Sequence, residues 1–301
     1  MAETSGSVDF IVGDETYQTW YKVFGDLKSG SRPLVLIHGG PGIPHDYLLP
    51  HASLSQTHSI PVICYDQVGC GWSTRLPDKP KEFWKEELFM DELENLVARL
   101  GIANDFDVLG HSWGGMLATK WASTRHPKGL GRIVIVGTPA SIDLGDKSVA
   151  MLIEGLPDAT RAVIKKHLEA GTTEEPEFKA AVQYYFSQHI CRLDPWPEHF
   201  AKSLERMGED PTVSKAMSGT TEFFVTGNMK GWRVLDTLHC ITQPTLVING
   251  RYDQAQDLCV SPFFEKIEKV KWVQLGNSSH LPFFEEKERY FQILTQFLRS
   301  V

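Results

Sequence analysis

Short apolar runs recur along this chain, and stretches with helical periodicity separate several of them. The runs are residues 33–38, 60–65, 106–110, 132–137, 245–250 and 270–275, preceded by an aromatic, β-branched segment at residues 16–24. Apolar runs of this length are typical of strands that are buried on both faces of a parallel sheet. Between two of them, Leu93, Leu96, Val97 and Leu100 form one apolar helical stripe. The alternation predicts an α/β fold with a mostly parallel, doubly wound sheet.

The alternation stops between about residues 141 and 231. Helical patterns continue there without an apolar strand run, at residues 151–155, 158–170, 177–190 and 198–207. Strands and helices alternate again after Trp232. We therefore expect a sheet domain formed by residues 1–140 and 232–301, with residues 141–231 inserted as a helical cap. Such a cap would cover the C-terminal edge of the sheet, which is where open α/β sheets bind their ligands.

The composition limits the kinds of partner that the protein is expected to bind. The chain has 301 residues with 42% hydrophobic and 23% charged side chains, which suits a globular protein with a sizeable core. Its net charge of −8, without basic blocks, argues against a nucleic-acid or anionic-membrane partner. The sequence has neither a transmembrane apolar run nor a recognisable signal peptide. We expect a cytoplasmic protein that acts on a small molecule or a short peptide.

The five cysteines give no reason to expect a metal or a cofactor. They are Cys64, Cys70, Cys191, Cys240 and Cys259, and none are spaced as C-x-x-C. An odd number without close pairs predicts neither a zinc site nor a disulfide framework. Intracellular free thiols are the simple interpretation.

The strongest chemical signal is a G-x-S-x-G motif at residues 110–114. It directly follows the apolar run at residues 106–110 and precedes a predicted helix at residues 116–122, which is the context that the motif requires. The central residue, Ser112, would sit on a sharp strand-to-helix turn that pushes its Oγ out of the sheet. The N–H of Trp113 would lie at the helix N-terminus, where it can stabilise an oxyanion.

A second glycine-rich segment, residues 38–42, follows the first apolar run. Glycines at this point allow the backbone to approach a ligand closely. In folds with the G-x-S-x-G turn, a second oxyanion donor comes from a loop in this region. The N–H of Gly40 is the candidate donor, and Gly39 is expected to line the substrate site.

A nucleophilic serine needs a base and an acid that orients the base. In this type of fold the acid and then the histidine follow the serine along the chain. Asp253 comes shortly after the run that ends at Gly250, and His280 comes shortly after the run that ends at Leu275. Both would lie at the active edge, so we predict a catalytic triad with Ser112. Asp257 lies four residues further along and is the weaker candidate for the acid.

Taken together, these motifs resemble those of the proline iminopeptidase family of α/β-hydrolases, which includes prolyl aminopeptidases and related L-amino acid amidases. The matching segments are residues 38–42, 65–73, 110–115, 250–253 and 279–280, so the resemblance covers about residues 33 to 280. It implies an α/β-hydrolase core with a helical cap, and it implies the same triad and the same two oxyanion donors. It also implies cleavage of an amide next to a small N-terminal residue, often proline.

The resemblance further implies that acidic residues near the cap bind the free amino group of the substrate. One such role falls on Glu222, in the segment at residues 217–223. A buried ammonium needs a carboxylate partner, so the role is physically sound. A second acid of the family usually follows the triad aspartate, and Gln254 occupies that position here. Gln254 can accept a hydrogen bond from the substrate but supplies no charge.

The leading hypothesis is therefore a serine hydrolase that cleaves an aminoacyl amide through an acyl-enzyme. Gln254 favours one alternative, a lactonase or esterase that acts on an uncharged metabolite. A binding protein that kept the fold, or an enzyme that catalyses a non-hydrolytic reaction such as an isomerisation, are further alternatives. Activity on arylamides with and without N-terminal acylation separates the first two, and labelling by a fluorophosphonate separates the enzymes from the binding protein.

Overall fold

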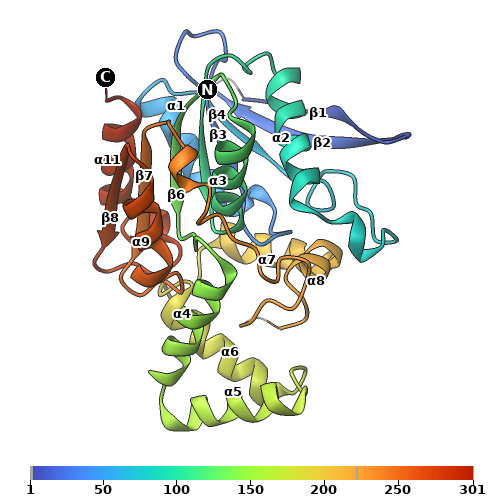
Figure 1. The fold of residues 1–301 in the computed structure, drawn as a ribbon, viewed down its shortest axis with the longest axis vertical. Coiled ribbons are helices and arrows are strands. Elements are labelled where there is room, and N and C mark those ends of the chain that lie inside the picture. Colours follow the sequence, from blue (N-terminus) through green and yellow to red (C-terminus); the bar gives the residue numbers. More distant parts are fainter. Residues whose placement is uncertain (1–2, 222, 301) are drawn as a thin grey trace.

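An eight-stranded sheet runs through the centre of the computed structural model, which describes residues 3–221 and 223–300 (Figure 1). The strands are β1 Glu3–Val12, β2 Glu15–Phe24, β3 Leu34–Ile37, β4 Val62–Tyr65, β5 Phe106–His111, β6 Leu130–Val136, β7 Thr245–Gly250 and β8 Val270–Leu275. Their spatial order is β1-β2-β4-β3-β5-β6-β7-β8. The strands from β3 to β8 are parallel, and β1 and β2 pair in antiparallel fashion at one edge. The predicted mostly parallel α/β sheet is confirmed.

The first strand, β1, has no counterpart among the predicted runs. Its sequence is largely polar and most of its residues are exposed or half-buried. It forms by pairing with β2 along its whole length, from the pair Glu3 and Phe24 to the pair Val12 and Glu15. A strand at the sheet edge needs only one partner and little burial, so it leaves no continuous apolar run in the sequence.

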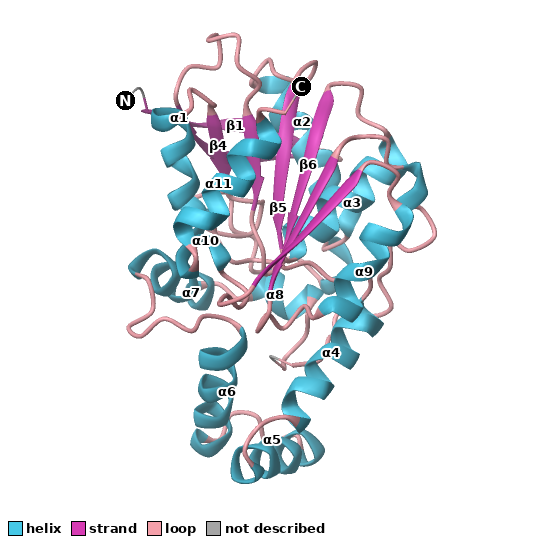
Figure 2. Ribbon diagram, turned by 90° about the vertical axis from the view of Figure 1, so that its left-hand side faces the viewer, coloured by secondary structure: helices cyan, strands magenta, loops and turns pink. Residues whose placement is uncertain are grey.

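The central strands are buried on both faces. In β3, Leu34 and Leu36 pack into one hydrophobic cluster, whereas Val35 and Ile37 pack into another on the opposite face. The helices that cover the first of these faces are α1 Ser53–Thr57, α10 Pro282–Glu285 and α11 Lys287–Leu298, together with the 3₁₀ helix η1 His45–Ala52. The other face is covered by α2 Glu86–Arg99, α3 Trp113–Arg125 and α9 Asp257–Lys266 (Figure 2).

Among the described residues, five α-helices are inserted between β6 and β7. They are α4 Ile142–Glu154, α5 Asp158–Ala170, α6 Pro176–His189, α7 Glu198–Glu209 and α8 Thr212–Met217. Of the short 3₁₀ helices, η2 Lys81–Phe83 precedes α2, whereas η3 Leu238–Cys240 lies between α8 and β7. Helices α4, α5 and α6 extend beyond the sheet, away from both termini (Figure 1), and Ile164, Phe178 and Tyr185 form part of a hydrophobic cluster of their own. The division into a sheet domain and a cap, with boundaries at residues 141 and 231, stays a prediction.

No helix within residues 3–221 and 223–300 combines the length and the apolar character that a membrane crossing requires.

A buried carboxyl group joins the antiparallel edge of the sheet to the loop that follows β4. Glu92, on α2, is fully buried and accepts hydrogen bonds from Thr19 Oγ1 on β2 and from the backbone N–H of Val68. Burial raises the pKa of Glu92 to about 8, although both hydrogen bonds act in the opposite direction. The folded protein therefore holds a proton on Glu92 at neutral pH, where the unfolded chain releases it.

This proton makes stability depend on pH. Between the ordinary pKa of 4.5 and the folded pKa of about 8, the folded state binds more protons than the unfolded chain. The free energy of unfolding therefore falls by up to about 1.4 kcal/mol for each unit by which the pH rises. We predict that Glu92→Gln lacks this contribution and gains stability relative to wild type between pH 5 and pH 8. Urea unfolding at several pH values measures the difference. The matched control, Glu87→Gln, removes an exposed carboxylate from the same helix. Equal pH dependence in all three proteins would contradict the prediction.

Candidate active site

The backbone turns sharply at Ser112, between β5 and α3. Its φ and ψ are 55° and −119°, a left-handed conformation that non-glycine residues rarely adopt. The N–H of Ser112 donates to the carbonyl of Val136 on the neighbouring strand at 2.8 Å, and α3 begins at the next residue, Trp113. This is the strand-to-helix turn that the sequence motif predicts.

The glycines of the motif are required because backbones lie in close contact on both sides of the turn. A Cβ on Gly114 would lie 2.0 Å from the carbonyl oxygen of Ile37, at the end of β3. A Cβ on Gly110 would lie 2.3 Å from the carbonyl oxygen of Gly114. Any larger residue at either position would push α3 away from the sheet and move Ser112.

The two expected oxyanion donors lie beside Ser112. Gly40 has φ of 110° and lines the same cavities as Ser112, whereas Trp113 provides the first N–H of α3. Within residues 3–221 and 223–300, neither N–H donates to another group of the protein. The N–H of Gly39 is different, because it donates to the hydroxyl of Tyr47 at 2.7 Å. Gly39 thus lines the larger cavity, but its own N–H is bound by Tyr47, which lines the same cavity.

A neutral histidine holds the glycine-rich loop in place. The N–H of Gln67 donates to Nε2 of His38 at 3.0 Å, so the proton of this imidazole is on Nδ1, which donates to the carbonyl of Gly39 at 3.0 Å. Burial lowers the pKa of His38 to about 4, so this tautomer persists at neutral pH. Gln67 also accepts a hydrogen bond from Nε1 of Trp113 at 3.0 Å. The loops after β3 and β4 and the start of α3 therefore form one connected unit.

The structure brings His280 and Asp253 together. Nδ1 of His280 lies 2.7 Å from Oδ1 of Asp253, which is fully buried and also accepts the N–H of Ala255 at 2.8 Å. The other candidate acid, Asp257, accepts hydrogen bonds from side-chain amides of Asn249 and Gln274 instead. Of the two candidate acids, Asp253 is therefore the one that contacts His280, and it does so through Nδ1 and not through Nε2.

A second polar chain joins the glycine-rich loop to the backbone of His280. The hydroxyl of Tyr47 receives the N–H of Gly39 and donates to Nδ1 of His111 at 2.9 Å. Nε2 of His111 donates to the carbonyl of His280 at 2.9 Å. Burial and the neighbouring His280 hold the pKa of His111 well below its ordinary value, so the ring stays neutral and each nitrogen keeps one role.

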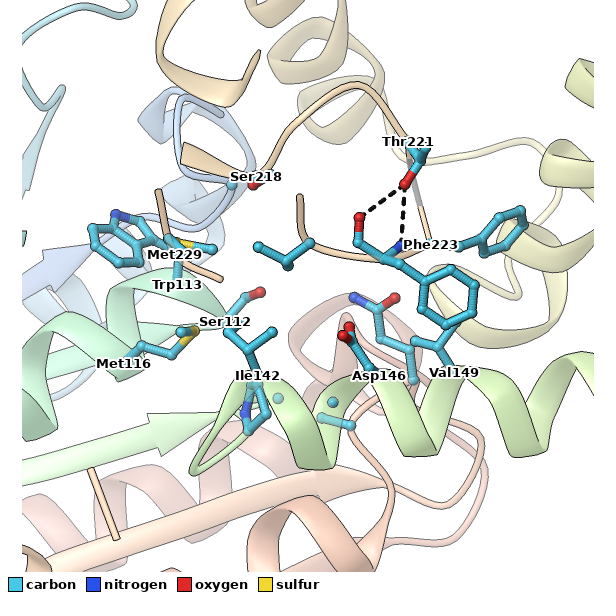
Figure 3. A pocket seen from close by; sticks show the side chains of 18 residues that line it. Ser112, Trp113, Met116, Ile142, Asp146, Val149, Ser218, Thr221, Phe223 and Met229 are labelled. Carbon is cyan, nitrogen blue, oxygen red and sulfur yellow. Dashed lines mark hydrogen bonds between the residues drawn. The ribbon is translucent and has the colours of Figure 1, made fainter. Parts of the chain in front are cut away.

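Ser112 lies between two cavities. The smaller has a volume of about 160 Å³ and is lined by α4 and by the segment around residues 218–229, as Figure 3 shows. The larger has a volume of about 610 Å³ and is lined by α6, α7, the glycine-rich loop and residues 211–221, of which Ser218 and Thr221 also line the smaller cavity. His280 lines only the larger cavity, whereas Asp146 lines only the smaller. Gly40 and Gln254 border both.

Gln254 is fixed by the inserted helices. Its N–H donates to the carbonyl of His189 on α6 at 3.2 Å, and its carbonyl accepts the hydroxyl of Ser148 on α4 at 2.6 Å. His189 also donates from Nδ1 to the carbonyl of Tyr252 at 2.9 Å. The loop that carries Asp253 is therefore braced by α4 and α6. Glu222, the other residue expected to bind the substrate, lies outside the described residues.

Sequence reasoning missed several of these positions. Tyr47 lies in a 3₁₀ helix without periodicity, and the roles of Ser148 and His189 depend on contacts with a loop far away in sequence. No local signal identifies them. Asp146 did leave a signal, because it occupies the apolar face of α4 between Ile142 and Val149, where a charged residue is unexpected.

In the part of the chain that the structure describes, no group of three or more histidine, cysteine, aspartate or glutamate side chains is placed to hold a metal ion.

Fold and site together define an α/β-hydrolase, and comparison with known proteins agrees. The sequence profile of the alpha/beta hydrolase fold matches residues 32–287. The proline iminopeptidase of Saccharolobus solfataricus is 35% identical over 97% of this chain and 91% of its own length. The proline iminopeptidase of Thermoplasma volcanium is 32% identical over 100% of this chain and 99% of its own length.

Two solved structures are similar over nearly the whole chain. The proline iminopeptidase of Mycobacterium smegmatis superposes with a TM-score of 0.91 at 38% identity and covers 97% of both chains. The protein VinJ superposes with a TM-score of 0.93 at 42% identity and covers 98% of both chains. The chain therefore belongs to the proline iminopeptidase family of α/β-hydrolases, and it is a hydrolase. The resemblance inferred from the sequence motifs is confirmed.

A substitution at Gly137, which follows β6, tests the geometry of the histidine–aspartate pair. A Cβ at this position would lie 2.8 Å from Nδ1 of His280 and 3.0 Å from Oδ2 of Asp253, and its φ of 57° disfavours other residues. We predict that Gly137→Ala displaces the imidazole and lowers kcat by about 100-fold or more, because small misplacements in active sites have effects of that size. Steady-state kinetics on an arylamide substrate measures the loss.

The control for this prediction is Gly276→Ala. Gly276 follows β8, close in sequence to His280, and a Cβ there meets no atom within 4 Å. It should retain wild-type activity. Undiminished kcat in a folded Gly137→Ala variant would contradict the geometry described here.

Proposed function

We propose that this hydrolase removes a small N-terminal residue from an amide through a covalent acyl-enzyme. The observation that carries the proposal is the position of Ser112, on a strained turn between two cavities, of which only the larger is bordered by His280. The family of the chain agrees with this function. Its relatives in Saccharolobus solfataricus and Thermoplasma volcanium are named proline iminopeptidases.

In the first half of the reaction, Ser112 Oγ attacks the carbonyl carbon and His280 Nε2 takes the hydroxyl proton. Asp253 orients the imidazole and stabilises its charged form. The N–H groups of Gly40 and Trp113 stabilise the oxyanion of the tetrahedral intermediate. His280 then gives the proton to the nitrogen of the leaving amine, the C–N bond breaks, and the acyl group stays on Ser112 as an ester.

In the second half, water attacks this ester while His280 accepts one of its protons. The second tetrahedral intermediate collapses, His280 returns the proton to Ser112 Oγ, and the free acid leaves. The chemistry of both halves needs only groups of the chain and water.

The position of His280 suggests which half of the substrate each cavity would hold. The leaving amine must receive its proton from His280, so it has to lie on the side of Ser112 that His280 borders, which is the larger cavity. The acyl group then occupies the smaller cavity of about 160 Å³. This arrangement favours a small acyl residue, such as prolyl or alanyl, joined to a larger amine. We propose that the inserted helices, within residues 141–231, act as the cap that encloses both groups.

The proposal predicts that the enzyme hydrolyses prolyl or alanyl arylamides and prefers them to their N-acylated counterparts. Ser112→Ala should fold normally and lose about 10⁴- to 10⁶-fold in kcat, as loss of a serine nucleophile does in other serine hydrolases. Release of the chromogenic amine measures the rates. Ser29→Ala, an exposed serine between β2 and β3, is the control.

One other function has an observation in its favour. Gln254 borders both cavities and supplies no charge, which suits an esterase or lactonase that acts on an uncharged metabolite. A preference for blocked arylamides, esters or lactones over free aminoacyl arylamides would support that function and overturn the aminopeptidase proposal. Activity that survives in Ser112→Ala would overturn the mechanism for either substrate class.

A further inference from the structure

Asp146 is the only ionisable side chain among the described residues that line the smaller cavity. The other described lining groups are apolar side chains, glycines, hydroxyl groups and the amide of Gln254. A carboxylate is costly in such surroundings unless a cation or hydrogen-bond donors compensate for the lost water. The presence of Asp146 in this cavity therefore requires an explanation.

The helix places this side chain in the cavity that Ser112 also lines. Ile142, Asp146 and Val149 follow the spacing i, i+4 and i+7 on α4, so they share one face of the helix, and all three line the cavity. Figure 3 shows Asp146 projecting from α4 into the same space as the hydroxyl of Ser112. An acyl group bound to Ser112 in this cavity would extend toward the carboxylate.

The groups around Asp146 do not neutralise it. Burial raises its pKa from the ordinary value, and the charge of Asp143 on the same helix adds to this effect. The backbone N–H of Val225 and the charge of Lys230 act in the opposite direction, but they do not offset the burial. An ammonium group entering the cavity would provide the ion-pair partner that this half-buried carboxylate lacks within the described part of the chain.

We propose that Asp146 binds the free amino group of the substrate's N-terminal residue and thereby selects substrates with an unblocked amine. This assignment rests on the proposed function, because it places the acyl residue in the smaller cavity. The amide oxygen of Gln254, which borders the same cavity, can accept a second hydrogen bond from the ammonium. The charge on this side of the site then comes from α4 and not from position 254.

The test compares two substrates that differ only in the amine. Prolyl 4-nitroanilide carries it, and cyclopentanecarboxylic acid 4-nitroanilide has the same ring shape with a CH₂ group in its place. The readout is the ratio of kcat/KM for the two substrates. In wild type, the ratio should strongly favour the prolyl compound. In Asp146→Asn, it should fall by about 10- to 100-fold, because the ammonium loses the carboxylate charge with which it pairs.

Two further variants separate this role from a structural one. Asp143→Asn removes the same charge from the exposed face of the same helix and should keep the wild-type ratio. Asp146→Glu keeps the carboxylate and should retain most of the preference, so it reports on Asp146 even if the asparagine variant folds poorly. Thermal unfolding of each variant checks the fold.

The outcomes distinguish the two proposals. An Asp146→Asn enzyme that keeps the wild-type ratio would overturn the assignment of Asp146 and leave the proposed function intact. A wild-type enzyme that does not prefer the prolyl compound would overturn the proposed function and the assignment together. A drop in the ratio for Asp146→Asn alone, with slow hydrolysis of the cyclopentane compound unchanged, supports both.

Discussion

The left-handed backbone of Ser112 is the constraint on which the rest of the site depends. A conformation of this kind costs about 1–3 kcal/mol and persists only where the surrounding structure enforces it. Here the enforcement comes from three adjacent strands: the end of β3 contacts Gly114, β5 delivers the turn, and β6 accepts the N–H of Ser112. The strain exposes Ser112 at the C-terminal edge and starts α3 immediately behind it, so one local distortion places both the proposed nucleophile and a proposed oxyanion donor.

Two neutral, buried histidines hold the loops at this edge of the sheet in fixed positions relative to one another. His38 connects the glycine-rich loop to the loop after β4, and His111 connects Tyr47 to the backbone of His280. Each ring is held neutral by burial, so each nitrogen acts either as a donor or as an acceptor and the networks have one arrangement. In contrast, His280 has the carboxylate of Asp253 at Nδ1, which fixes the orientation of its ring.

The sequence predicted most of the fold. The strands from β3 to β7 are apolar runs because both faces of the sheet are covered, and the strand-turn-helix context predicted the turn at Ser112 from five residues. Chain order predicted Asp253 and His280 as partners, and the structure places Nδ1 of His280 2.7 Å from Oδ1 of Asp253. Their catalytic roles with Ser112 stay a prediction. What the sequence could not reveal depends on distant contacts: Tyr47 acts through His111, and Gln254 is held by Ser148 and His189. Asp146 could have been found from the sequence, because a charged residue on the apolar face of a predicted helix is visible there.

The two cavities give the site a direction, because His280, the proposed proton donor, borders only one of them. That direction has meaning only if Ser112 is the nucleophile. The most direct test is covalent labelling with a fluorophosphonate, in which Ser112 Oγ displaces fluoride, followed by mass spectrometry of the digested protein. The account predicts one adduct, on Ser112, that is absent in Ser112→Ala and much slower to form in His280→Gln. An unlabelled wild-type protein, or an adduct on another residue, would contradict it.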